Sequence, residues 1–76
     1  MNKFESVLEP LPDGLWKLTL FLPRQTDEMK DKTSPEGLSV ATAKTWAEGL
    51  IRAEGFVELL GWQPLEGGKY QIEMTM

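Results

Sequence analysis

The sequence contains neither cysteine nor histidine, and these two absences remove much of the chemistry that a small protein can carry. Without cysteine there is no disulfide framework, no thiolate nucleophile and no zinc-finger spacing. Without histidine the chain lacks the side chain that titrates near neutral pH and the commonest metal ligand. Glycine-rich phosphate-binding motifs of the GxGxxG and GxxxxGK[ST] types do not occur either. We therefore expect no catalytic residues, no cofactor and no enzyme activity.

Carboxylates are abundant, yet their spacing does not predict a metal site. Asp27, Glu28 and Asp31 lie close together but lack the glycine and the twelve-residue ligand spacing of an EF-hand loop. Lysine and arginine are few, eight against twelve aspartates and glutamates, so the net charge is −4. A duplex-binding surface usually clusters basic residues. Nucleic acid is therefore not an expected partner, whereas a basic protein suits the charge.

Long apolar runs are also missing. No segment approaches the ~18–20 residues needed to cross a bilayer, and residues 1–6 lack the apolar core of a signal peptide. These features predict no membrane association and a cytoplasmic location. With 76 residues the chain predicts a single domain, 1–76, in which one core is marginally sufficient, so good packing or self-association is needed to stabilise it.

The sequence does contain one amphipathic segment around which the rest is organised. Residues 39–54 predict a helix, with Ser39 as the N-cap and Gly55 just past the last turn. Its apolar face consists of Val40, Ala43, Ala47, Leu50 and Ile51. One helix cannot bury this face by itself, so a sheet is expected to cover it.

Two other features of the helix allow more than one interpretation. Lys44, Glu48 and Arg52 form a stripe opposite the apolar face, and their i, i+4 spacing is typical of a solvated surface. Trp46 lies on the flank of the apolar face. It is either an edge of the core or an anchor for a partner.

Before the helix, residues 4–22 predict a β-hairpin. Residues 12–14 read Pro-Asp-Gly between two apolar segments, which is typical of a tight turn with the glycine at positive φ in a G1 bulge. The register that this turn fixes places Glu9–Lys17 on one face and Leu8–Leu18 on the other. The second face is almost wholly apolar and is expected to contact the helix, since a slip of one residue would bury the charges.

The solvent-facing side of this hairpin is not wholly polar. It carries the apolar side chains of Val7, Leu11, Leu15 and Phe21. Apolar patches of this kind often mark contact sites. These residues are therefore candidates for partner binding, and the alternatives are scattered surface residues or cover by a terminus or loop.

The remaining segments complete a β-β-α-β-β pattern. Residues 23–36 are highly charged, contain Met29 as their one large apolar residue, and predict a mobile loop. Residues 56–76 predict a second hairpin, although 56–60 is either strand or a continuation of the helix. The expected fold class is α+β, an antiparallel sheet of two hairpins with one helix packed on one face.

A local pattern over about 7–50 resembles the HicB-like antitoxins. It consists of Leu8-Glu9-Pro10, then Asp13-Gly14 and an aromatic strand, then Gly37 followed by Ser39 and alanines at 43 and 47. The resemblance implies a hairpin that precedes the helix and an antitoxin-like regulatory role. The proline-glycine-cysteine-like stretch of that family is replaced here by the charged loop, and no DNA-binding tail follows, so neither toxin neutralisation nor operator binding is assigned.

Together these features predict a non-catalytic protein-binding module, such as a small inhibitor, adaptor or immunity-type protein of microbial or phage origin. The candidate partner-binding residues are Val7, Leu11, Leu15, Phe21, Met29 and Trp46. The alternatives are a homo-oligomeric structural protein, for instance a homo-dimer, and an antitoxin-like regulator. Stacking of bases on Trp16, Trp62 and Tyr70 would instead indicate single-stranded nucleic acid, but core positions are expected for these rings.

Overall fold

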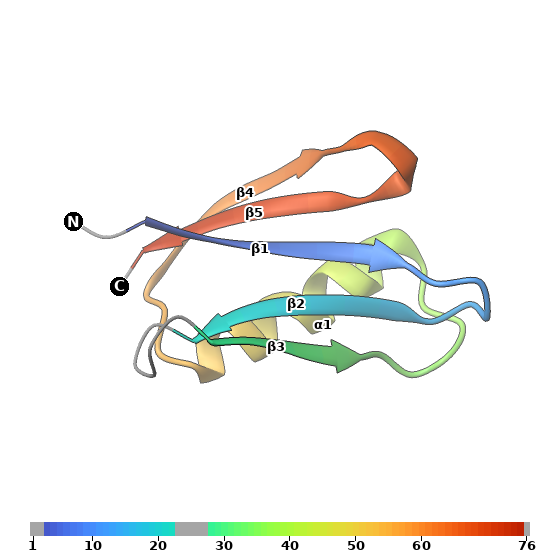
Figure 1. Ribbon diagram of the computed structural model, residues 1–76, viewed down its shortest axis with the longest axis horizontal. Helices are drawn as coiled ribbons and strands as arrows, with labels where there is room; N and C mark the ends of the chain where they lie inside the picture. The colour runs from blue at the N-terminus through green and yellow to red at the C-terminus, as the bar shows by residue number, and fades with distance from the viewer. Residues whose placement is uncertain (1–2, 23–27, 76) are drawn as a thin grey trace.

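A computed structural model describes residues 3–22 and 28–75 of the chain (Figure 1). It contains one helix and one antiparallel five-stranded sheet of order β3-β2-β1-β5-β4. The elements are β1 (Lys3–Pro10), β2 (Trp16–Leu22), β3 (Glu28–Thr33), α1 (Val40–Ala53), β4 (Glu58–Pro64) and β5 (Tyr70–Thr75), with a short 3-10 turn at Glu66–Gly68. In Figure 1, α1 passes behind β2, so the helix covers one face of the sheet. The expected α+β class is confirmed.

The first hairpin has the register that its turn predicts. Glu9 is paired with Lys17, and Leu8 with Leu18. The loop closes through a 2.8 Å hydrogen bond from the backbone N–H of Leu11 to the carbonyl oxygen of Leu15. Gly14 has φ 76°, a conformation that glycine adopts without the steric penalty of a side chain. Local turn chemistry therefore fixes which face of this hairpin is buried.

The expectation of a loop over 23–36 is wrong for residues 28–33, which form strand β3. Its register runs from Leu22–Glu28 to Lys17–Thr33, so every residue of β3 is paired with β2. Residues 23–27, including Asp27 of the acidic cluster, lie outside the described residues. Charged side chains suit an edge strand because they discourage further strand pairing. Backbone pairing, and not an apolar face, thus holds this segment in the sheet.

Helix α1 has the expected ends. The Ser39 hydroxyl accepts from the backbone N–H of Thr42 at 3.2 Å, and Gly55 follows the last turn with φ 102°. Ala43, Ala47 and Ile51 are fully buried against the sheet. Two small alanines allow the helix axis to approach the strands closely. Val40, expected on the buried face, is instead exposed at the first turn, where the sheet no longer covers the helix.

The sheet contributes the larger side chains of the core. Leu8, Leu18, Leu20, Ile72 and Met74 are fully buried on the face that α1 covers. Trp16 fixes the segment before the helix to the start of β2. Its backbone N–H donates to the Ser34 hydroxyl at 2.9 Å, and its indole Nε1 donates to the Leu38 carbonyl oxygen at 3.1 Å.

The second hairpin contains a β-bulge that explains the irregular pattern of its first strand. Leu59 pairs with Met74 and Trp62 with Ile72, so the two residues between them, Leu60 and Gly61, oppose one residue of β5. Beyond the bulge, the residues of β4 that face the core change from odd-numbered to even-numbered positions. Both Leu59 and Trp62 therefore pack against the core, although they are three positions apart. The helix does not continue into 56–60, because Phe56 is buried in the core and Glu58 and Leu59 are paired with β5.

Candidate protein-binding face

The sheet face opposite α1, here called the outer face, contains part of the predicted contact set. Val7 lies on it, between Thr19 of β2 and Gln71 of β5. Leu11 and Leu15 flank the turn of the first hairpin, and all three apolar side chains are half-buried. The helix lies on the other side, and no described helix or strand covers this face (Figure 1). Val7 is thus an apolar position within a sheet face open to solvent.

The other predicted contact residues are Phe21, Met29 and Trp46. Phe21 and Met29 are paired across β2 and β3, and their side chains lie outside the described residues. Trp46 is half-buried and packs against the hydrophobic core on the helix side of the sheet. The structure therefore separates Trp46 from the outer face. Its position corresponds to the core-edge alternative.

Besides Val40 of α1, the exposed large apolar side chains of the described residues lie around β4, which the sequence did not indicate as a contact segment. Val57 is 80% exposed, Leu60 46% and Leu65 40%. Val57 precedes β4, Leu60 lies within it and Leu65 follows it, and β4 is one of the two edge strands of the sheet. Leu60 is exposed because the bulge turns it away from the core side that Leu59 and Trp62 occupy. The only signal in the sequence is the break in alternation next to Gly61.

A hollow of about 240 Å³ lies at this bulge. It is lined by Leu60, Gly61, Gln63, Gln71 and Glu73. Gln71 is also the cross-strand partner of Val7. The hollow therefore adjoins the predicted contact residue Val7 and extends from β5 to the edge strand β4. The outer face thus combines a shallow apolar area with a recess whose walls carry two carboxamides and one carboxylate.

The outer face carries several charged side chains. The Glu9 carboxylate lies 3.2 Å from the ammonium groups of both Lys17 and Lys69. Hydrogen bonds from Lys17 and then Lys69, together with their positive charges, hold the pKa of Glu9 below its usual value. Nearer the hollow, Glu5 and Glu73 are directly opposite each other on β1 and β5. The carboxylates of Glu5 and Glu73 therefore lie side by side on the outer face next to the hollow.

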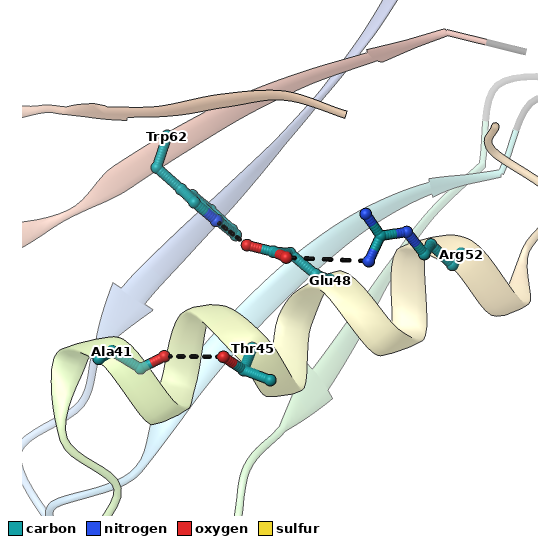
Figure 2. A network of polar contacts seen from close by, with 5 residues as sticks. All are labelled: Ala41, Thr45, Glu48, Arg52 and Trp62. Carbon is teal, nitrogen blue, oxygen red and sulfur yellow. Dashed lines mark hydrogen bonds and ion pairs between the residues drawn. The ribbon is translucent and has the colours of Figure 1, made fainter. Parts of the chain in front are cut away.

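The stripe expected to be solvated instead connects the helix to the second hairpin (Figure 2). The indole Nε1 of Trp62 donates to the Glu48 carboxylate at 2.8 Å, and Arg52 lies 3.9 Å from the same carboxylate. The Lys44 ammonium lies 4.1 Å from the centre of the Tyr70 ring. The i, i+4 pair of Glu48 with Arg52 is confirmed, but its stripe faces β4 and β5. The sequence did not predict this, because the rotation of a helix about its own axis on a sheet depends on tertiary packing.

These contacts also occupy the aromatic rings that might have stacked on bases. Trp16 is buried, Trp62 is tied to the helix, and Tyr70 lies beneath a lysine. A base-stacking platform needs exposed ring faces along a basic groove. The geometry does not favour single-stranded nucleic acid as a ligand.

Other kinds of site are not evident in the part of the chain that the structure describes. Residues 3–22 and 28–75 place no three His, Cys, Asp or Glu side chains where they would hold a metal ion. Over the same residues, the helix is neither long nor apolar enough to span a membrane. The chain matches no protein-family model, and no curated protein or solved structure is significantly similar to it.

Proposed function

We propose that the protein is a non-catalytic protein-binding module that contacts its partner through the outer face of its sheet. The single observation that supports this most is the combination of one covered and one open sheet face. On the open face, Val7 is paired with Gln71, and Gln71 lines the hollow together with the exposed Leu60. Recesses beside apolar surface are where a few anchor residues supply most of the affinity in protein complexes.

Charge supports a basic partner. The chain carries a net charge of −4, and the carboxylates of Glu5 and Glu73 lie together beside the hollow. Complementary charge raises association rates and excludes wrong partners. A small cytoplasmic inhibitor, adaptor or immunity-type protein of a microbe or phage is consistent with such a surface.

Substitution on the outer face tests this proposal. Val7→Ser combined with Leu60→Ser removes two apolar contacts without introducing charge. A matched control, Ala41→Ser with Ala53→Ser, adds the same polar groups on exposed positions of α1. Partner binding from the native host, measured by quantitative capture, is expected to fall at least tenfold for the first pair and not for the second. Equal retention of the partner by both pairs, with intact folds, would refute the proposed surface.

Self-association is a second candidate, and it is supported by the exposed apolar side chains around the edge strand β4. An edge strand offers unpaired backbone groups to another copy. Gly61 in the bulge and Pro64 at the end of β4 shorten the regular part of that edge, because proline donates no hydrogen bond. Sedimentation over a range of dilutions distinguishes the two functions. If the protein is a monomer at all concentrations, self-association is excluded and binding of a different protein remains.

A further inference from the structure

The hollow at the bulge of β4 has a size and lining that indicate what enters it. Gly61 has φ 95°, and a Cβ placed there would meet no atom within 4 Å, so the recess is open at this point. Its volume, about 240 Å³, is below the roughly 300–1,000 Å³ of sites for drug-sized ligands. A single side chain of a protein partner is therefore a better match than a free metabolite.

The walls present two kinds of surface to such a side chain. Leu60 supplies an apolar wall, whereas Gln63 and Gln71 carry carboxamides and Glu73 a carboxylate. Glu5 lies opposite Glu73 in the β1–β5 register and adds negative charge beside the recess. The recess therefore offers apolar, carboxamide and carboxylate groups together, a combination that suits a cationic side chain with an apolar stem.

We propose that the hollow binds one arginine side chain of the protein partner, and this inference rests on the proposed protein-binding function. The methylene stem would pack on Leu60, and the guanidinium would donate to Glu73 and to the carboxamide oxygens of Gln63 or Gln71. Arginine fits better than lysine because its planar group offers five donors to several acceptors and sheds water more easily. Glu73 also makes another contact within the chain. A carboxylate has about four acceptor positions, so it can serve both.

The test uses the whole protein and a blocked amino acid, so it does not need the partner. Nα-acetyl-arginine amide is titrated into the 15N-labelled protein, and blocked citrulline serves as a neutral probe of nearly the same shape. We expect saturable shifts of the Gly61, Gln71 and Glu73 amides with a dissociation constant on the order of millimolar for arginine. Citrulline should give no saturable shifts at these amides. Equal responses to both probes, or no response to arginine well above that concentration, would overturn the proposal.

Variants assign the binding to the hollow. Glu73→Gln should weaken arginine binding about tenfold, since it removes the charge from one hydrogen bond. Glu54→Gln removes the same charge from the exposed end of α1 and should have no effect. If Glu73→Gln disturbs the fold, Leu60→Ser tests the apolar wall instead and should also weaken binding. Unchanged affinity in a folded Glu73→Gln or Leu60→Ser variant would refute the arginine site but leave the outer face as a contact surface.

Discussion

The indole N–H of Trp62 on β4 and the carboxylate of Glu48 on α1 are joined by a 2.8 Å hydrogen bond (Figure 2). This contact connects the edge strand to the helix across 14 positions of sequence. Strand β4 is thus joined to the helix as well as to β5, with which it pairs. The edge of the sheet that carries the bulge and the hollow therefore has a second contact, on the covered side.

The Trp62–Glu48 contact should be measurable as a coupling energy. In a double-mutant cycle with Trp62→Phe and Glu48→Ala, we expect a coupling of about 1–2 kcal/mol in the free energy of unfolding, the range for a partly exposed hydrogen bond to a charged group. Urea unfolding of the four proteins measures it. Additive effects of the two substitutions would show that the contact does not stabilise the fold. Glu54→Ala, an exposed change on the same helix, serves as the control.

Removing the hydroxyl should change the free energy of unfolding differently at two buried serines. Ser34 accepts from the Trp16 backbone N–H at 2.9 Å and donates to the Pro35 carbonyl oxygen at 2.8 Å. Ser34→Ala leaves those groups unpaired and should lower the free energy of unfolding by about 1–3 kcal/mol. The Ser6 hydroxyl is buried without a hydrogen-bond partner among the described residues. Ser6→Ala should therefore be neutral or stabilising, and a loss comparable with that of Ser34→Ala would contradict this assignment.

Two glycines offer a similar contrast. Gly49 lies in α1 with no atom within 4 Å of an added Cβ, so Gly49→Ala should stabilise the protein by up to about 1 kcal/mol through helix propensity. Gly61 has equal space, but its φ of 95° is strained for any residue with a side chain. Gly61→Ala should destabilise by about 1–2 kcal/mol. Thermal unfolding of both variants checks the signs, and stabilisation by Gly61→Ala would mean that the bulge is not formed as described.

The ion pairs of Glu9 predict a pH dependence. Because Lys17 and Lys69 lower the pKa of Glu9 in the folded state, its contribution to stability is fully present above the unfolded pKa and is lost as pH falls through the folded pKa. A carboxyl NMR titration should give Glu9 a midpoint below that of a model glutamate. Lys17→Met and Lys69→Met should each raise that midpoint. A Glu9 midpoint that neither substitution moves would rule out the two lysines as the cause.

The parts of the fold that the sequence predicts are those controlled by local chemistry. The turn around Gly14 and the alternation beside it determine the Glu9–Lys17 register, and Ser39 and Gly55 determine the ends of the helix. Strand β3 could not be predicted in this way. Its side chains carry no apolar face, and it is a strand because β2 provides hydrogen-bonding partners along its full length.

The candidate site follows the same division. Val7 could be placed on the outer face from the sequence, since its alternation with Leu8 is local. The hollow could not, because it forms where the bulge of β4 meets Gln71 and Glu73 of β5. Lys44 and Glu48 also appeared to belong to a solvated stripe until the roll of α1 placed them against Tyr70 and Trp62. These features depend on packing between segments that are distant in sequence.

Site-specific photo-crosslinking in the native host tests the central claim, binding through the outer face, most directly. A photoreactive phenylalanine analogue is placed at Val7 or Leu60 on the outer face and at Ala41 or Ala53 on the exposed side of α1. The proposed function predicts one covalent protein adduct from each outer-face position and none from the helix. Adducts from the helix alone, or equal adducts from both sides, would contradict it.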